Sequence, residues 1–525
     1  MKKNIISLFN YMMLTLLFGS VGGGLLASCD MDVQPQGAIP DTETLVNVSD
    51  YEDFNNGLYA LMRSITSGDY VVLSDVQLDD FNAVIGNGNR RMEFYNGQVQ
   101  PSTGEIGAIF SGYYSAIAQT NFFIQNVTEK MKETTLVPSD LNNIKRWAGQ
   151  AYFFRAYCYS GLADKFCQSY KNSTNRDAEG TGLSLQLVYA PTADNTTYLG
   201  RSSLTNTYRQ IVADLTAAIS LLTEYEKEGD APVSDNKYVS SDAAKALLAR
   251  VYLNMGMDQE AAELAMELIN SKRYELISQK RAFHEMWFRD SGTEIIWKVG
   301  ADYSYHGSPT GDAFCNNEQN PDYVPNNAAV YLFEENDTRW YAWFDNDINE
   351  NISAKEKNIT NSGGTASMFL FAKYPGNPIL QPNGASGSNF INMGKPLRIG
   401  EIYLIAAEAY ANLGDEAKAK EQLAALEKAR STGHNINKLS GTNLIEELYD
   451  ERHRELMGEG LRQADLKRWN IGFVRSDAYD GQNSIIISNY RNIQYNAGDY
   501  RLTWPIPQHE IDSNPQIAKQ QNPGY

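Results

Sequence analysis

The most regular hydrophobic pattern in the chain lies between residues 446 and 469. Apolar and long side chains recur there at steps of three and four residues, which places them on one face of a helix. They are Ile445, Leu448, Tyr449, Arg452 and Leu456. Gly458 and Gly460 interrupt the pattern, and a second short helix is predicted from Leu461 to Trp469. The sequence therefore predicts two helices joined at a pair of glycines.

Charged residues fill the other faces of this helix pair. Acids alternate with arginines, and pairs such as Glu451–Arg454, Arg452–Glu455 and Asp465–Arg468 lie three positions apart, which makes them neighbours on a helix. A run of this kind is commonly a solvated helix face. Arginines beside the acids should, however, lower the pKa of each carboxyl rather than prepare one as a general acid. We therefore predict a structural ion-pair network here and no catalytic residues.

Two earlier stretches have the spacing of tetratricopeptide repeats. Residues 401–431 and 242–270 each carry a tyrosine, small residues that let two helices approach closely, and a turn glycine. A third, weaker pair is predicted from Trp147 onward, with a partner helix from Tyr208 to Glu224. The units are not stacked at the spacing of about 34 residues of a plain solenoid. They must therefore form one helical scaffold from which long insertions project.

Two such insertions, about residues 68–112 and 287–397, are rich in glycine, asparagine, aspartate and aromatic residues. An aromatic ring beside amide or carboxylate groups suits a sugar, whose apolar face stacks on the ring while its hydroxyls form hydrogen bonds. Each ring could equally pack an insertion against the helices. The candidate carbohydrate-binding residues are Phe81, Asn82, Tyr303, Tyr305, Trp340 and Trp343.

The N-terminus has the pattern of a bacterial lipoprotein signal. Lys2 and Lys3 precede an apolar run that ends in Leu26-Ala27-Ser28-Cys29. This predicts a signal peptide over residues 1–28, lipid attachment at Cys29, and a polar tether over residues 29–50. The alternative is a retained transmembrane anchor, which the glycines in the run disfavour.

Net charge and cysteine content limit the remaining possibilities. The formal net charge of −19, without a basic cluster, argues against nucleic acid as a partner. Beyond Cys29 the odd number of cysteines (Cys158, Cys167 and Cys315) gives no disulfide framework. A bond between Cys158 and Cys167 is conceivable, but we expect buried free thiols.

Motifs for enzymes and metals are weak. No phosphate-binding glycine loop or G-x-S-x-G turn is present, and His284-Glu285 lacks the second histidine of a zinc protease because Phe occupies position 288. Because the chain has so many acidic residues, the sequence leaves open a pair of facing carboxylates of the kind that a glycosidase uses. One calcium-loop spacing, through Asp345, Asp347, Asn349 and Glu356, has Glu350 where glycine is required. We expect no cofactor, with calcium as the weak alternative.

A family resemblance rests on the C-terminal half. The pattern ER-x-x-EL-x-x-EG-x-R-x-x-DL-x-RW, beginning at Glu451 and ending at Trp469, resembles the signature of SusD/RagB outer-membrane glycan-binding lipoproteins. The tail, with Leu502-Thr503-Trp504-Pro505-Ile506-Pro507 and a final Gly524-Tyr525, is similar to that family as well. The stretch from Lys165 to Tyr170 departs from the G-x-x-P-like segment that is usual there.

The resemblance implies a mainly α fold, a tetratricopeptide-type scaffold with irregular, aromatic-rich insertions in a single body over residues 51–525. The scaffold would comprise about residues 51–67, 113–165, 204–286 and 398–475, the insertions 68–112 and 287–397 would hold the ligand, and residues 476–525 would form a C-terminal segment.

The resemblance also implies a function. The protein would be a non-enzymatic, surface-exposed lipoprotein, anchored in the outer membrane through its lipid, that captures a glycan. It would deliver the glycan to a SusC-like TonB-dependent β-barrel transporter, over whose mouth it acts as a hinged lid. The alternatives are a tetratricopeptide-type adaptor for a protein or peptide, which would not need aromatic insertions, and a surface glycosidase.

Overall fold

The structure is a computed structural model that describes residues 44–227, 236–315, 321–344, 356–385 and 387–525. The chain divides into two compact units, Met1–Asn47 and Val48–Tyr525, and the second contains the elements named below. The predicted signal peptide, Cys29 and the tether up to residue 43 lie outside the described residues, as do Asp345, Asp347 and Asn349. In the described part of the chain, no helix combines the length and apolar character needed to cross a membrane.

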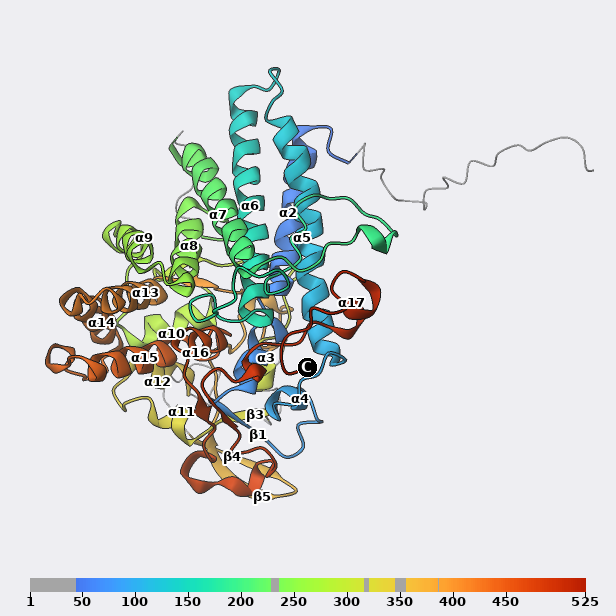
Figure 1. Cartoon of the computed structure of the whole chain (residues 1–525). Coiled ribbons are helices and arrows are strands. Elements are labelled where there is room, and N and C mark those ends of the chain that lie inside the picture. Colours follow the sequence, from blue (N-terminus) through green and yellow to red (C-terminus); the bar gives the residue numbers. More distant parts are fainter. Residues whose placement is uncertain (1–43, 228–235, 316–320, 345–355, 386) are drawn as a thin grey trace, which may run out of the picture. The chain divides into compact units, whose positions relative to one another are not determined.

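The second unit is mainly helical, as predicted (Figure 1). Its α-helices are α2 (Val48–Ile65), α3 (Asp69–Gln77), α4 (Met92–Tyr95), α5 (Gly104–Lys130), α6 (Pro138–Phe166), α7 (Leu204–Lys227), α8 (Ser241–Met255), α9 (Asp258–Asn270), α10 (Lys280–Phe288), α11 (Asn327–Tyr331), α12 (Thr338–Trp343), α13 (Ile399–Asn412), α14 (Glu416–Arg430), α15 (Thr442–Leu456), α16 (Arg462–Trp469) and α17 (Gln508–Ser513). Its strands are β1 (Phe81–Ala83), β2 (Ile295–Trp297), β3 (Tyr323–Pro325), β4 (Glu356–Asn361), β5 (Gly364–Phe369), β6 (Leu397–Arg398), β7 (Phe473–Val474) and β8 (Gln494–Tyr495).

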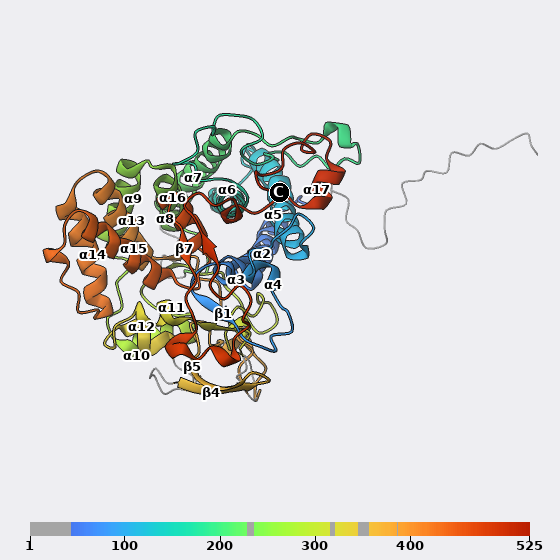
Figure 2. The same cartoon turned by 60° about the horizontal axis from the view of Figure 1, so that its bottom comes forward.

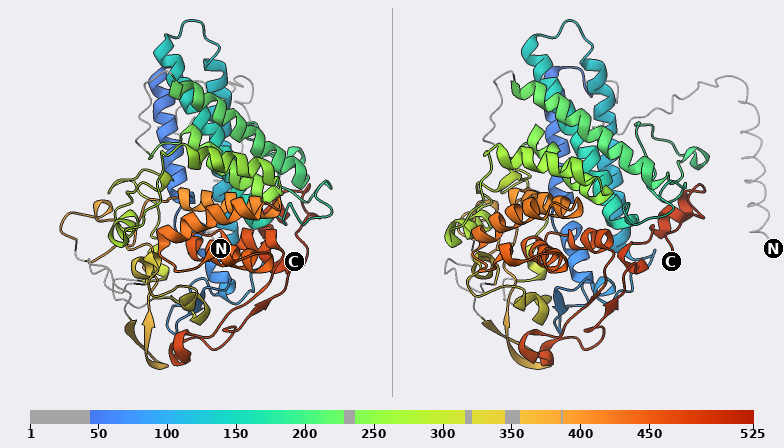
Figure 3. Two further views of the ribbon diagram at one scale, coloured as in Figure 1. Left: turned by 90° about the vertical axis from the view of Figure 1, so that its left-hand side faces the viewer. Right: turned by 60° about the vertical axis from the view of Figure 1, so that its left-hand side comes forward.

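The scaffold consists of helix pairs that pack in succession. The pairs α6–α7, α8–α9 and α13–α14 each pack face to face, α7 also contacts α8, and α9 contacts α13. In Figure 3 the orange helices α13 and α14 lie against the green pair α8–α9. The small residues that the repeat spacing singled out, among them Ala249, Ala261 and Ala419, are buried between the helices. The tetratricopeptide-type scaffold is confirmed.

The last pair is less regular than the others. Whereas α15 packs on α13, α16 turns away and packs against α3 and α6. Side chains still couple the two helices, because Arg452 of α15 pairs with Asp465 of α16 at 2.8 Å and the rings of Tyr449 and Trp469 stack 3.9 Å apart. The predicted helix–glycine–helix unit therefore links the scaffold to the first insertion.

Short antiparallel strand pairs hold the insertions in place. Strand β2 pairs with β6, so the long second insertion leaves and rejoins the scaffold at one point, which is why α9 and α13 can be neighbours. Strand β1 pairs with β3 and joins the two insertions, with Phe81 opposite Pro325. The remaining pairs are β4–β5 and β7–β8. Figure 2 shows α10, α11, α12 and the β4–β5 hairpin gathered on one side of the scaffold.

The first insertion contains more helix than its sequence suggested. Helix α3 occupies residues 69–77 with Val72, Leu73 and Val76 buried, and α5 begins at Gly104, before the predicted boundary at residue 113. The glycines and polar residues of this segment concealed a helix of nine residues, which is shorter than the window over which helical periodicity can be recognised.

The cysteines are buried free thiols, as the sequence predicted, and the C-terminal tail is anchored in the interior as well. Cys158, Cys167 and Cys315 are buried free thiols. Trp504 is fully buried, and its indole N–H donates to Gln77 Oε1 at 2.7 Å while its backbone N–H donates to the carbonyl of Lys165 at 2.8 Å. The tail thus closes over the end of α6.

Candidate functional site

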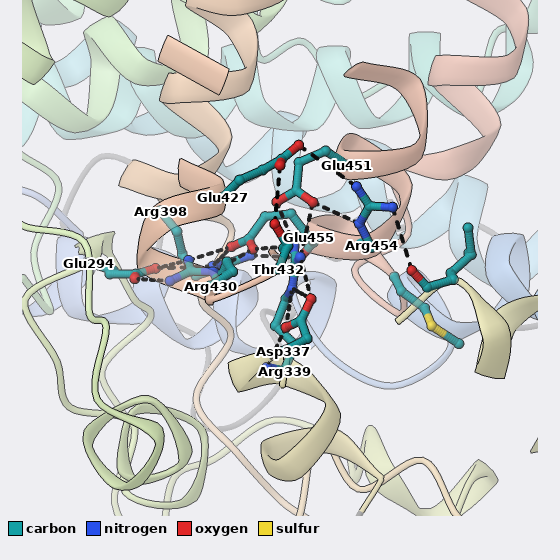
Figure 4. Close-up of polar contacts among 12 residues, drawn as sticks. Glu294, Asp337, Arg339, Arg398, Glu427, Arg430, Thr432, Glu451, Arg454 and Glu455 are labelled. Carbon is teal, nitrogen blue, oxygen red and sulfur yellow. Dashed lines mark hydrogen bonds and ion pairs between the residues drawn. The ribbon is translucent and has the colours of Figure 1, made fainter. Parts of the chain in front are cut away.

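The acids and arginines of α15 form a buried ion-pair network (Figure 4). At its centre Glu455 is paired with Arg339 of α12 at 3.1 Å, Arg398 of β6 at 2.8 Å and Arg430 of α14 at 2.9 Å. The side chains of all four residues are at most 1% exposed. Because Arg339 belongs to the second insertion and Arg430 to the scaffold, Glu455 ties the two together.

Further pairs extend this network in both directions. Arg430 also binds Glu294 with two nitrogens, at 2.8 and 2.9 Å, and Arg339 binds Glu451 with two nitrogens, at 2.9 and 3.0 Å. Arginine–carboxylate pairs of this two-pronged kind fix geometry as well as charge. The network is therefore a rigid joint between the helices and the insertion.

The pKa values of the acids fit a structural role. Burial acts to raise the pKa of Glu455, but Arg430 and Arg398 outweigh it and hold the pKa well below its ordinary value. Glu451 is likewise buried and Glu459 is largely so, with 10% of its side chain exposed, and facing cations lower the pKa of each. Acids that are ionised, paired and inaccessible cannot donate a proton to a substrate. The prediction of a structural network is confirmed, but the predicted pair Arg452–Glu455 is wrong, because Arg452 turns to Asp465 instead.

The pKa values of one acid and one lysine at the edge of the network are shifted in the opposite sense, toward the uncharged form. Burial, together with the neighbouring Glu451 and Glu447, raises the pKa of Glu427 to about 9. Burial also lowers the pKa of Lys373 to about 8, although Glu459 opposes this shift. Lys373 Nζ lies 3.8 Å from the centre of the Trp343 ring.

The two signature glycines are required where the network meets the insertions. Gly458 has a φ of +77°, and a Cβ there would lie 2.5 Å from Phe371 Cε1. Gly460 has a φ of +74° and donates its backbone N–H to Asp75 of α3 at 2.8 Å. Left-handed backbone of this kind favours glycine, and it lets both insertions approach the end of α15 closely.

Three of the candidate carbohydrate-binding residues are buried, which is a correction to the expectation that they face a ligand. Phe81 packs its ring on Phe314, with ring centres 4.5 Å apart. Asn82 donates to the carbonyl of Ser476 at 3.1 Å and is fully buried. Trp343 is also fully buried and packs on the Trp287 ring. These side chains hold the insertions together, because large apolar rings gain most from leaving water.

Tyr303 and Tyr305 are exposed, as their loop position suggested. Their side chains are 52% and 67% exposed. Asp302 shapes the turn that presents them, because its carboxylate accepts the backbone N–H groups of Ser304 and Tyr305, each at 2.8 Å. The loop is fixed to the end of α2, where the backbone N–H of Ser308 donates to the hydroxyl of Ser67 at 2.9 Å.

A second series of rings, which runs from the surface to the buried Phe369, was not predicted as a group. Tyr331 of α11 is 64% exposed, and its ring centre lies 5.8 Å from that of the half-buried Tyr479. Tyr479 in turn contacts Phe369 of β5, and Phe369 contacts the half-buried Trp340, the fourth ring of the series. We call these four residues the aromatic strip. Of its members, the sequence singled out Trp340.

Polar groups lie beside the aromatic strip. Burial and then the nearby carboxylate of Glu356 raise the pKa of Tyr479 to about 12, so its phenol remains a hydrogen-bond donor at neutral pH. Glu356 begins β4, is exposed, and accepts the hydroxyl of Ser367 at 2.6 Å. Asp480, next in the chain to Tyr479, is exposed as well. Rings flanked by acceptors and a donor are the combination that a pyranose requires.

Two causes explain why the strip was missed in the sequence. Tyr479 belongs to the C-terminal segment, far in sequence from the insertions, and Tyr331 lies in a short apolar stretch whose neighbours Ala329 and Val330 are buried. One signal was available, because Tyr331 lies on the face of a five-residue helix opposite two small buried residues. The packing that brings Tyr479 beside it was not visible in the sequence.

The helical scaffold contains a cavity of about 370 Å³, lined among others by Tyr225, Tyr238 and Tyr274. Some of its polar groups are paired with one another: Arg146 donates to the Tyr225 hydroxyl at 3.1 Å, and the Tyr274 hydroxyl donates to Asp242 at 3.1 Å. We favour the exposed rings as the candidate site, because a polymeric sugar needs an open surface on which to stack.

Family models match the chain along most of its length. The model of the SusD family matches residues 195–525. A second model, described as starch-binding and associating with the outer membrane, matches residues 31–253.

Individual relatives agree with these matches. The SusD-like protein P2 of Formosa agariphila is 25% identical, covering 95% of this chain and 97% of that protein. Among solved structures, a SusD superfamily protein from Bacteroides thetaiotaomicron is 26% identical, with a TM-score of 0.73 over 91% of this chain and 100% of that one. A putative sugar binding protein from Bacteroides vulgatus, 23% identical with a TM-score of 0.73 over 92% and 99% of the two chains, shares the fold.

Proposed function

Because this chain belongs to the SusD family, we propose that it is a surface lipoprotein that binds a glycan and delivers it to a TonB-dependent β-barrel transporter in the outer membrane. Proteins of this family bind carbohydrate and are not enzymes, and the buried, paired acids of α15 are consistent with that. The family model over residues 31–253 carries the association with starch and with the outer membrane.

The pair formed by exposed Tyr331 and half-buried Tyr479 is the observation that carries the binding role. Two rings inclined at 45° with centres 5.8 Å apart form a shallow angled surface on which neighbouring sugar units can stack. Glu356 and Asp480 would accept hydroxyl hydrogens at its rim. Open, wet sites of this type give modest affinity, because little of the ligand is removed from water.

Tyr303 and Tyr305 form a second proposed contact. They are exposed on a turn that Asp302 fixes, so little side-chain or backbone freedom would be lost when a sugar stacks on them. A polysaccharide can engage two such elements along its length, which strengthens weak individual contacts through effective concentration.

Calorimetry with the mature protein against a panel of host and plant polysaccharides tests the binding role. We expect one glycan class to bind and Tyr331→Ala to weaken that binding. The double variant Tyr303→Ala/Tyr305→Ala tests the second contact separately. Tyr490→Ala is the matched control, because Tyr490 is an exposed tyrosine (42%) outside both groups. Folded protein that binds nothing across a wide panel would refute the glycan role.

Membrane attachment and delivery need separate experiments. Cys29→Ala should release the protein from the membrane fraction, because stable anchoring depends on the acyl chains that Cys29 would carry. Unchanged fractionation of the variant would exclude lipid attachment there.

Delivery predicts a stable partner. Affinity capture of the full-length protein from detergent-solubilised outer membrane should recover a large TonB-dependent β-barrel. Recovery of the protein alone, from membranes in which such barrels are detected, would count against a role in transport.

A further inference from the structure

The link between α14 and α15 brings one imidazole and two carboxylates together. Glu427 lies in the last turn of α14, His434 in the link, and Glu447 in the second turn of α15. One ligand atom from each of the three residues lies within 4.8 Å of the others. None of the three takes part in the proposed glycan contacts.

The two nitrogens of His434 face different surroundings. Nδ1 lies 3.0 Å from Glu447 Oε1 and 3.4 Å from Glu427 Oε2, yet it is buried and makes no hydrogen bond. Nε2 lies 2.9 Å from Glu334 Oε1. A metal-binding histidine has this arrangement: one nitrogen faces the cation, while the other N–H is held by a carboxylate that fixes the ring.

Glu427 supplies a second, independent observation. Its side chain is only 2% exposed, and its Oε1 has no hydrogen-bond partner. The nearest cation is Arg454 Nη2 at 3.9 Å (Figure 4), but Arg454 is already bound to Glu451 at 2.7 Å and to Glu447. A buried carboxyl oxygen without a partner is costly, and either a retained proton or a bound cation can complete it.

The backbone of the link is shaped to bring these groups together. Gly433 has a φ of +80°, and a Cβ there would lie 2.8 Å from Glu334 Oε2. A larger residue would therefore be strained and would displace Glu334 from its position beside the His434 ring. Thr432 donates its hydroxyl to Glu427 Oε2 at 3.1 Å and orients that carboxylate.

We propose that Glu427, His434 and Glu447 bind a divalent transition-metal cation of the zinc class, through His434 Nδ1 and one oxygen of each carboxylate. Glu334 is the positioning residue that holds the imidazole. An imidazole ligand favours zinc and its neighbours over calcium, which takes oxygen ligands. The cation would hold the start of α15, the helix that carries the buried network, against the end of α14. This inference is independent of the glycan role.

A comparable cluster of Asp79, Asp80 and His453 also contains a buried carboxylate oxygen without a hydrogen-bond partner, Asp80 Oδ2. It differs in its histidine, because His453 Nε2 makes a hydrogen bond with Asp80 whereas His434 Nδ1 makes none. Asp79 is paired with Arg462 at 2.8 Å, so we assign that cluster to the ion-pair network.

Zinc binding to the intact mature protein tests the proposal. After treatment with a chelator and desalting, titration with zinc chloride should show one site per chain and raise the thermal midpoint, because a ligand that binds the folded state stabilises it. Calcium chloride should produce neither effect. His434→Gln and Glu427→Gln should abolish the site, and Glu334→Gln should weaken it about 10- to 100-fold. The matched control is His509→Gln, since His509 is half exposed and lies 3.4 Å from Glu510.

Two results would overturn the proposal. One is folded wild-type protein that takes up no zinc, and the other is zinc affinity that His434→Gln leaves unchanged. If the variants fail to fold, X-ray absorption of the zinc-loaded wild type decides the question. One imidazole nitrogen among oxygen ligands is expected, whereas an all-oxygen shell or two imidazoles would refute the assignment.

Discussion

The signature helix pair α15–α16 and the aromatic insertions contain the two groups of residues most suggestive of function. The two groups differ in their exposure to solvent. The acids and arginines of the helix pair are buried, with Glu455 held by three arginines. Most large rings of the insertions are buried as well, but Tyr303, Tyr305 and Tyr331 are exposed. The region with the stronger family pattern thus maintains the fold, while the region with the weaker one presents the rings that we propose for ligand contact.

A regular sequence motif and a ligand-binding surface therefore need not coincide in this protein. A buried charge must be paired in fixed geometry, so its partners are specified at definite positions and produce a readable motif. A surface ring that stacks on a sugar needs only exposure and a suitable neighbour. Many positions satisfy that requirement, and no fixed spacing results.

Acidification should produce the largest contrast between the two regions. The pKa values of Glu451, Glu455 and Glu459 are held below the ordinary value of 4.5, and that of Asp465 below 3.8, by facing cations that outweigh burial. Such carboxyls stabilise the fold above the pKa of the unfolded chain and lose this contribution as the pH falls through their folded values. The urea midpoint should therefore drop steeply below about pH 4.5. A midpoint that is constant down to pH 3 would contradict the network.

Glu455→Ala should have the next-largest effect. The change removes the carboxylate that is shared by Arg339, Arg398 and Arg430. Loss of one partner from a buried pair costs about 3–5 kcal/mol in the free energy of unfolding. Denaturant unfolding measures this loss. Lys132→Ala removes an exposed pair with Glu129 and should leave the midpoint unchanged. Equal effects of the two substitutions would remove the distinction between buried and surface charges.

Trp343→Ala should destabilise the insertion by a similar or slightly smaller amount. The ring is fully buried against Phe283 and Trp287, and truncation of a buried aromatic residue costs about 3–5 kcal/mol. No charge loses its only partner, because Lys373 keeps Glu459 at 2.8 Å. Thermal unfolding measures the effect. If Trp343→Ala instead left stability unchanged and abolished glycan binding, the ring would belong to the ligand site after all.

Tyr331→Ala should have the smallest effect on stability and a measurable one on binding. An exposed ring contributes little to the fold, so the unfolding midpoint should stay within about 0.5 kcal/mol of wild type. Loss of one stacking contact of about 0.5–1.5 kcal/mol should raise the glycan Kd about 2- to 12-fold. Calorimetry with the glycan found in the panel measures this change. A destabilised variant with unchanged affinity would reverse the roles of the two regions.

The sequence was sufficient for the scaffold and for the nature of the helix pair. Helical periodicity and small residues at contact positions are local properties, so α8–α9 and α13–α14 could be predicted from neighbouring residues alone. The alternation of acids with arginines in α15 was likewise enough to predict paired carboxyls. Short helix α3 was missed, because nine residues among glycines give too little periodicity.

The ligand surface could not be predicted to the same degree. Phe81, Asn82 and Trp343 have the composition of a sugar site, but whether a ring faces solvent depends on segments that approach it from elsewhere in the chain. Trp343 is covered by α10, and Tyr479 reaches Tyr331 from a segment almost 150 positions later. Exposure is a property of the packed molecule and has no local signature.

The sequence by itself thus determined the fold class, the family resemblance and the local pair Glu451–Arg454, because each depends on the spacing of residues within one or two helices. The three arginines that hold Glu455 come from separate segments and were brought together by the tertiary structure. The tertiary structure alone decided which aromatic rings remain at the surface, and it brought His434 between Glu427 and Glu447. Both outcomes depend on side chains from separate segments meeting in space, and contacts of that kind form only when the scaffold and the insertions pack together.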